Sequence, residues 1–199
     1  AECTRTLKSA ALSLDGRTLA GSDGKVVRLW DIATGAPVGQ PITPGGAQAV
    51  VDVIACSPDR RLVVTAGRND AQPAMLWDAT TGRRIGPVAS EDQAFRHHMA
   101  CFSADSSRLA TVRYGGKDPA LVWDTSPGNA DPTGSPVARV VIWGISQLAF
   151  SPDASQLLVR GTNTMDLVDA RSGSIIARLG QPGSDPKKDR LLFVSHACF

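Results

Sequence analysis

Hydrophobic and polar residues alternate in short runs along this chain, and clusters of turn residues separate the runs. Two clear runs, 51–55 and 62–66, lie on either side of the segment Ser57-Pro58-Asp59. Alternation over four to six residues is typical of half-buried strands, and Ser, Pro and Asp are common turn formers. A third run at 25–30 and a run rich in Pro and Gly at 36–40 predict a third strand and an edge strand. The pattern therefore predicts an all-β chain of short antiparallel strands.

The turns and strand ends recur as three ordered landmarks. The first is Ser-x-Asp, and its serines, spaced by 44, 46 and 48 residues, are Ser13, Ser57, Ser103 and Ser151. The second is an apolar residue followed by Trp-Asp, at Trp30-Asp31, Trp77-Asp78 and Trp123-Asp124, and it degenerates to Val168-Asp169. The third is a Thr/Ser-Gly turn at 34–35, 81–82 and 172–173, which is expanded in the third copy over 126–136. A fixed order at a nearly fixed spacing indicates four copies of one structural unit.

Four strands in about 46 residues, ending in Trp-Asp, resemble the repeats of the WD-repeat β-propeller family. The resemblance covers residues 9–180 and implies a β-propeller of four-stranded antiparallel blades. The structural repeat positions that it implies are Trp30, Asp31, Trp77, Asp78, Trp123, Asp124 and Asp169. The excess of Arg, sixteen against five Lys, is similar to that of bacterial members from GC-rich genomes.

The repeat predicts one propeller domain over residues 1–199. Its expected parts are blade 1 at 9–45, blade 2 at 46–90, blade 3 at 91–138, blade 4 at 139–182 and the start of a fifth blade at 183–199. The fifth start is expected because His196-Ala197-Cys198-Phe199 parallels Met99-Ala100-Cys101-Phe102. We therefore expect a partial or open propeller, either a fragment of a longer ring or one completed by a further chain segment.

The polar network around the Trp-Asp tryptophans departs from the resembling family. Family blades commonly carry a Gly-His pair whose His bonds to the Trp, and no copy here has it at the corresponding place. A buried indole N–H needs an acceptor, and Thr65 and Thr111 are placed to serve Trp77 and Trp123. Gly21 and Val159 hold the same place in the other copies. We predict blades held mainly by apolar packing, with an incomplete polar network.

Composition excludes several classes of protein. With 199 residues, 42% hydrophobic and 20% charged, the chain has the composition of a folded globular protein. The net charge of +2 argues against a dedicated nucleic-acid binder, and no apolar run is long enough to span a membrane. The chain starts at Ala1-Glu2-Cys3 without an initiating Met or a targeting pattern, and a cytoplasmic location is the expectation. Seventeen Asp stand against two Glu, and eight of these Asp fall at the repeated turns.

Candidate reactive groups are better explained by the fold. Cys56 and Cys101 align with core positions, and Cys198 with Cys101, so we expect packing rather than redox or metal chemistry. His97 and His98 are adjacent in a strand and point to opposite faces, which prevents joint chelation. The segment Gly21–Val26 faintly resembles a phosphate-binding loop, but an Asp-Gly hairpin turn explains it better. We therefore expect no catalytic residue, no metal and no cofactor.

Positions that vary between copies remain as candidates for partner binding. In the resembling family, the loops between strands two and three, and those between blades, lie on the face that most often binds partners. The residues implied in this way are Asp23, Lys25, Arg68, Asn69, Asp70, Arg113, Tyr114, Lys117, Asp118, Arg160 and Asn163. The first hypothesis is a non-catalytic scaffold or sensor module for protein partners, part of a larger bacterial protein. The alternatives are an enzyme or ligand-binding propeller using the central channel, the regulatory region of a multidomain kinase or NTPase, and edge-to-edge self-association.

Overall fold

The computed structural model describes residues 7–44, 51–67, 74–88, 98–113, 119–129, 131–162 and 164–179. Within these residues every regular element is a strand, and the strands form four antiparallel sheets of four strands each. We call the sheets blades 1 to 4 in chain order. The expected start of a fifth blade at 183–199 lies outside the described residues.

The strand bounds follow the repeat. Blade 1 holds β1 (Ser9–Leu12), β2 (Thr18–Ser22), β3 (Val27–Asp31) and β4 (Pro37–Ile42), and blade 2 holds β5 (Val51–Cys56), β6 (Leu62–Gly67), β7 (Met75–Asp78) and β8 (Arg84–Pro87). Blade 3 holds β9 (His98–Phe102), β10 (Arg108–Arg113), β11 (Ala120–Asp124) and β12 (Ala138–Val140), and blade 4 holds β13 (Gln147–Phe150), β14 (Gln156–Arg160), β15 (Met165–Asp169) and β16 (Ile175–Leu179). The expected limit of blade 3 at 138 falls inside β12, whose last residue, Val140, pairs with Ala120.

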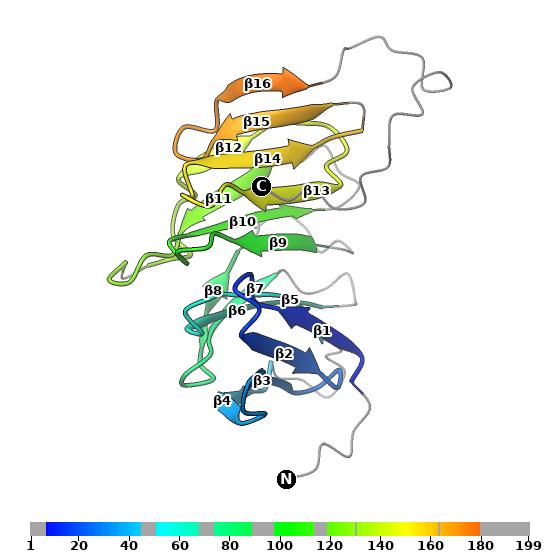
Figure 1. The fold of residues 1–199 in the computed structure, drawn as a ribbon, viewed down its shortest axis with the longest axis vertical. Coiled ribbons are helices and arrows are strands. Elements are labelled where there is room, and N and C mark those ends of the chain that lie inside the picture. Colours follow the sequence, from blue (N-terminus) through cyan, green and yellow to red (C-terminus); the bar gives the residue numbers. More distant parts are fainter. Residues whose placement is uncertain are drawn as a thin grey trace.

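The blades are stacked in chain order. In each blade the strands are hydrogen-bonded in sequence order, so the first and fourth strands are the two edges. The first strands of consecutive blades are neighbours, with β1 beside β5, β5 beside β9 and β9 beside β13. Figure 1 shows the resulting stack, from blade 1 at the bottom to blade 4 at the top. The expectation of an open propeller is confirmed, because the described blades form an arc that does not close.

The Ser-x-Asp landmark forms the turn between the first two strands of every blade. In blade 2, Oγ of Ser57 donates to Oδ1 of Asp59 at 2.6 Å and accepts the N–H of Leu62 at 2.9 Å. Arg60 takes a positive φ of 65° in this turn. Ser13, Ser103 and Ser151 make the same pair of bonds in the other blades. The turn chemistry of the repeated aspartates is therefore confirmed.

The cores of the molecule lie between blades. In each blade we call the face on the side of the next blade along the chain the forward face, and the opposite face the rear face. Between blades 1 and 2, for example, Leu29 on the forward face of blade 1 packs with Val63 and Trp77 on the rear face of blade 2. Two similar clusters join blade 2 to blade 3 and blade 3 to blade 4. Burial of apolar side chains between sheets is the main force that holds such a stack together.

The tryptophan network is partial, as the sequence predicted. Trp77 Nε1 donates to Thr65 Oγ1 at 2.8 Å, and Trp123 Nε1 donates to Thr111 Oγ1 at 2.9 Å. In blade 1, Gly21 leaves room for the ring of Trp30, whose Cζ3 would lie 3.0 Å from a Cβ at residue 21.

Blade 4 replaces the Trp with the buried Val168 and adds an ion pair next to it. The buried carboxylate of Asp166 lies 2.6 Å from Nε of Arg178 on β16. The carboxylate also accepts a hydrogen bond from the Thr164 hydroxyl at 2.9 Å. Among the described residues, the partners of this buried charge come from blade 4 itself, so the charge is paired within its own blade.

Candidate partner-binding surface

The strands of all four blades end on two opposite sides of the arc, and these two sides carry different turns and loops. One end, on the left in Figure 1, carries the Ser-x-Asp turns and the Asp-x-x-Thr-Gly turns, and we call it the turn end. The other end carries the loops between the second and third strands and the connections between blades, and we call it the loop end. Of the sequence-predicted partner residues, Asp23, Lys25 and Arg160 belong to the loop end.

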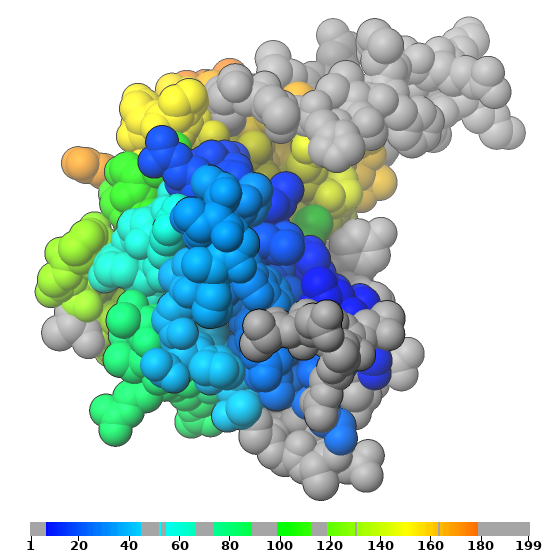
Figure 2. Space-filling model, turned by 60° about the horizontal axis from the view of Figure 1, so that its bottom comes forward, coloured from blue at the N-terminus to red at the C-terminus, as the bar shows by residue number. Residues whose placement is uncertain are grey.

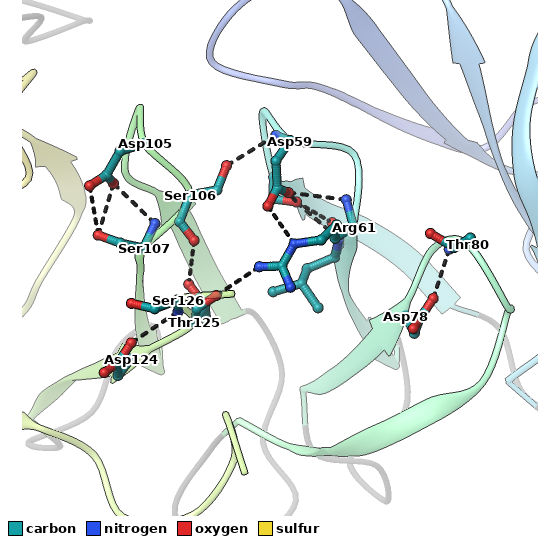
Figure 3. A network of polar contacts seen from close by, with 12 residues as sticks. Asp59, Arg61, Asp78, Thr80, Asp105, Ser106, Ser107, Asp124, Thr125 and Ser126 are labelled. Atoms are coloured by element: carbon teal, nitrogen blue, oxygen red, sulfur yellow. Dashed lines mark hydrogen bonds and ion pairs between the residues drawn. The ribbon is translucent and has the colours of Figure 1, made fainter. Parts of the chain in front are cut away.

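The turn end is a network that joins blades, as Figure 3 shows for blades 2 and 3. Arg61 forms an ion pair of 2.6 Å with Asp59, and its Nη2 donates to the carbonyl oxygen of Thr125 in blade 3 at 3.0 Å. The N–H of Asp59 donates to Oγ of Ser106 at 3.0 Å, and the Thr125 hydroxyl donates to the Ser106 carbonyl at 2.8 Å. These groups hold the two blades in register, so their chemistry is structural.

A cavity of about 250 Å³ lies beside this network. Its walls come from both blades and are Arg61, Leu62, Asp78, Thr80, Ile85, Thr125, Ser126, Asn129 and Pro132. The expanded segment 126–136 forms one wall and reaches back to blade 2, where a Cβ at Gly86 would lie 2.5 Å from Oγ1 of Thr133. Asp78 accepts hydrogen bonds from the N–H groups of Thr80 and Thr81 at 2.8 Å each, so this carboxylate stabilises the turn in which it lies.

The turn carboxylates are held in their ionised form. Hydrogen bonds from the Ser151 hydroxyl and from the N–H and hydroxyl of Ser155 lower the pKa of Asp153 to about 2. The N–H and hydroxyl of Thr34, with the ion-paired Arg60, lower the pKa of Asp31. At Asp59, partial burial raises the pKa, but hydrogen bonds from Ser57 and Arg61 outweigh it and the net shift is downward. The pKa values of these aspartates are lowered by hydrogen bonds within the turns. Such hydrogen bonds commonly lower the pKa of a carboxyl group outside active sites as well.

The two described cysteines are core residues, as expected. Cys56 packs between blades 1 and 2, and Cys101 packs against the core between blades 3 and 4. Burial raises the pKa of each thiol to about 12, which suppresses the reactive thiolate at neutral pH. Cys3, Cys198 and His97 lie outside the described residues, as does the side chain of His98.

Three of the sequence-predicted partner residues are described with their side chains. Asp23 Oδ1 accepts the N–H groups of Lys25 and Val26 at 2.9 Å each, and Gly24 has a φ of 94°, so Asp23 forms the expected hairpin turn. Lys25 is exposed beside it, whereas the half-buried Arg160 ends β14 in blade 4. The structure therefore places these residues on the first and last blades. Of Arg113 only the backbone is described, and Arg68, Asn69, Asp70, Tyr114, Lys117, Asp118 and Asn163 lie outside the described residues.

A more exposed apolar group lies along the outer strand of blade 3, β12, and in the connection that follows it at the loop end. Along 137–143 the even residues are buried, while Val137, Val141 and Trp143 are 42%, 69% and 62% exposed. Sequence reasoning missed this group. The available signals were the period-two run itself and Trp143, which is the tryptophan that stands outside the Trp-Asp landmarks. Large aromatic side chains that remain in water are unusual and mark interaction surfaces more often than polar residues do.

The backbone beneath Trp143 is tightly packed. The connection from β12 to β13 presses on the loop from β14 to β15, since a Cβ at Gly144 would lie 2.0 Å from Oγ1 of Thr162. The Trp143 carbonyl accepts the N–H of Thr162 at 3.1 Å. The neighbours Ile142 and Ile145 are buried in the core between blades 3 and 4. Trp143 is therefore carried on a backbone that two loops and a core fix in place.

Comparison with solved structures agrees with this architecture. A structure entitled "Crystal structure of the eukaryotic initiation factor" matches with a TM-score of 0.61 at 15% identity, over 91% of this chain and 45% of that one. The β-propeller domain of Cps50 (Swd1) from Myceliophteria thermophila matches with a TM-score of 0.60 at 17% identity, over 91% of this chain and 57% of that one. This chain has a β-propeller fold. The propeller described here spans about half the length of these two structures.

The match to a sequence family covers a shorter part of the chain than the structural matches do. Residues 2–31 of the propeller match the family described as WD domain, G-beta repeat, which includes the first Trp-Asp pair, Trp30-Asp31. No curated protein matches the sequence. In the part of the propeller that the structure describes, no three His, Cys, Asp or Glu side chains group as metal ligands do. No helix among the described residues is long and apolar enough to cross a bilayer.

Proposed function

We propose that this chain is a non-catalytic protein-interaction module built of WD repeats, a scaffold or sensor part of a larger bacterial protein. The loop end is the proposed partner-binding face, and the observation that supports it is the exposed pair Val141 and Trp143 on a fixed backbone. Rigid aromatic anchors contribute most to binding because they bury a large area and lose little conformational freedom. The turn end supports this choice, because its polar groups serve the contacts between blades.

The residues proposed from sequence extend this face across the arc. Lys25 and Arg160 are its described cationic members, and Arg68, Arg113 and Tyr114 are proposed to lie in the equivalent loops of blades 2 and 3. A face with one apolar anchor and scattered cations fits a protein partner that offers an apolar pocket with an acidic rim.

The test is affinity capture from a lysate of the source cell, followed by mass spectrometry. The variants are Trp143→Ala with Val141→Ser for the anchor, and Arg68→Ala with Tyr114→Ala for the residues proposed from sequence. Ile176→Ser in β16 is the matched control, since Ile176 is 51% exposed and lies on the outermost strand of blade 4. Proteins retained by the native chain and by the control, but lost with the anchor variant, would support the proposal. An identical set of captured proteins for all variants would contradict it.

A further inference from the structure

The cavity at the turn end between blades 2 and 3 is formed by a departure from the repeat. In blades 1, 2 and 4 a short Thr/Ser-Gly turn follows the third strand, whereas in blade 3 this turn is expanded over 126–136. Asn129 and Pro132 of the expanded segment line the cavity, and Thr133 lies against Gly86 of blade 2. Figure 2 shows the segment, in yellow-green, at the left side of the molecule, next to the turns of blade 2. The cavity therefore exists because blade 3 provides an additional wall.

The size and lining of the cavity suit one elongated side chain with a polar tip. Its volume of about 250 Å³ is that of roughly eight water molecules, and it lies below the range of about 300–1,000 Å³ found for pockets of drug-sized ligands. Leu62, Ile85 and Pro132 provide apolar walls, and Asp78 and Thr80 provide polar groups on the side of blade 2. Long charged side chains bind in such places with the methylene stem on apolar surface and the tip on a polar partner.

The carboxylate of Asp78 differs from its equivalent in blade 1 in what it binds. Oδ1 of Asp78 accepts two N–H groups of its own turn, and Oδ2 has no polar partner among the described residues. In blade 1, Oδ1 of Asp31 likewise accepts the N–H of Thr34, but Oδ2 forms an ion pair of 2.7 Å with Nη2 of Arg60 in blade 2. A Trp-Asp carboxylate of this repeat can therefore bind a guanidinium while it stabilises its turn.

Among the described residues, the chain provides no such arginine for Asp78. Arg60 directly follows the Ser-x-Asp landmark of blade 2 with a φ of 65°, and Ser106 holds this position in blade 3 with a φ of 61°. The two backbones turn alike, so the difference lies in the side chains. The Ser106 side chain is uncharged and much shorter, and its Oγ accepts the N–H of Asp59 at 3.0 Å. The carboxylate of Asp78 thus lines a cavity without the cation that its equivalent has.

The charges around the cavity favour a cation over an anion. Arg61 lines the cavity, but its Nε already lies 2.6 Å from Oδ2 of Asp59, and its Nη2 donates to the carbonyl oxygen of Thr125 at 3.0 Å. Figure 3 shows Arg61 between Thr125 of blade 3 and Asp78 of blade 2. Two carboxylates against one guanidinium leave one negative charge, and complementary charge is what selects an occupant.

We propose that this cavity binds an alkylguanidinium group, the chemistry of an arginine side chain, with the guanidinium on Oδ2 of Asp78 and the methylene stem against Ile85 and Pro132. A guanidinium suits the place because it is planar, permanently charged and presents several donors to a carboxylate. Binding reproduces, with a group from outside the chain, the pairing of Asp31 with Arg60. The site lies at the turn end and is independent of the partner-binding face proposed at the loop end.

A titration of the full 199-residue chain, followed by NMR of its backbone amides, tests the proposal. The probe is the peptide acetyl-Gly-Arg-Gly-amide, and the same peptide with lysine or with neutral citrulline in place of arginine is the control. The arginine peptide should shift the amides of 78–81 and 125–129 in a saturable way. It should bind roughly tenfold or more tightly than the citrulline peptide, which has no charge. The lysine peptide should bind more weakly as well, since an ammonium lacks the planar fork of donors.

The cation n-butylguanidinium distinguishes two sources of the bound group. An arginine peptide that binds as tightly as n-butylguanidinium, or more tightly, indicates an arginine of a partner protein. Tighter binding of n-butylguanidinium indicates a free small ligand. Either result supports a guanidinium site.

Two variants of the chain test the role of Asp78. Asp78→Asn removes the charge but keeps an oxygen for the N–H groups of the turn, and it should weaken binding of the arginine peptide by roughly tenfold or more. Ser106→Arg should also weaken binding, because it places an arginine of the chain where Arg60 lies in blade 2. Asp169→Asn is the matched control, since Oδ1 of Asp169 accepts two N–H groups in the equivalent turn of blade 4, away from the cavity. Circular dichroism checks that each variant is folded, and Ser106→Arg carries the test if Asp78→Asn unfolds.

Four results would overturn the proposal. The first is the absence of a saturable shift of these amides with the native chain. The second is a citrulline peptide that binds as well as the arginine peptide, and the third is a lysine peptide that does so. The fourth is binding that Asp78→Asn and Asp169→Asn change to the same extent.

Discussion

The indole nitrogen of Trp77 on β7 donates a 2.8 Å hydrogen bond to Oγ1 of Thr65 on the neighbouring β6. Both residues are buried on the rear face of blade 2. Thr65→Val keeps the shape of the side chain but leaves the indole N–H without an acceptor. We expect a loss of unfolding free energy of about 1–3 kcal/mol, measured by urea denaturation.

Thr18→Val is the control for this prediction. Thr18 is buried at the start of β2, and its Oγ1 has no hydrogen-bond partner among the described residues. Its replacement by Val should therefore be neutral or stabilising, because a buried polar atom without a partner is removed. Equal losses for Thr18→Val and Thr65→Val would contradict the role given to the Trp77 bond.

Gly39 and Gly35 provide a second matched pair. Both have a positive φ, 66° and 65°, so an alanine costs about 1–2 kcal/mol in backbone strain at either place. A Cβ at Gly39 would also lie 1.9 Å from the carbonyl oxygen of Ala79 in blade 2, whereas a Cβ at Gly35 meets no described atom within 4 Å. We expect Gly39→Ala to cost about 1–3 kcal/mol more than Gly35→Ala in urea denaturation. Similar costs would show that β4 does not depend on its close approach to blade 2.

Acid should weaken the fold through the turn carboxylates. Asp31 and Asp153 have pKa values below the ordinary 3.8, and that of Asp153 is about 2. A carboxyl whose pKa is lower in the folded state stabilises the fold above the unfolded pKa, and this stabilisation is lost as the pH falls through the folded pKa. The melting temperature should therefore fall between about pH 4 and pH 2.

Asp153→Asn gives the control for the acid effect. The variant should melt at a lower temperature than the native chain at neutral pH. Its melting temperature should fall less on acidification, because one titrating carboxyl group has been removed. Circular dichroism melts at several pH values measure both. A native chain with a constant melting temperature down to pH 2 would contradict the prediction.

Much of the fold could be predicted from the sequence because the turns are local. Ser57 and Asp59 form hydrogen bonds to backbone and side-chain groups within five residues, so the same residue types form the same turn in each copy. Trp77 pairs with Val63, so the diagonal placement of Thr65, two residues beyond Val63, also follows from register once β6 and β7 are known to pair. These features need no knowledge of how the blades sit in space.

The exposed surfaces could not be predicted in the same way. Leu12 has the same local sequence context as Phe102, and only the absence of a described blade beside it makes it exposed. Trp143 was overlooked because it lies in the turn after β12, and its exposure depends on how that turn packs against the neighbouring loop of blade 4. The contact of Thr133 with Gly86 depends on the distance between two blades, which no local pattern encodes.

The stacking of β1, β5, β9 and β13 in chain order has a consequence for how the molecule comes apart. The described core clusters each join one blade to the next, so stability is distributed as in an array with nearest-neighbour coupling. Segment 126–136 adds a second link between blades 2 and 3, through Thr133 and Gly86. Of the three described interfaces between blades, the one between blades 2 and 3 should therefore be the last to separate.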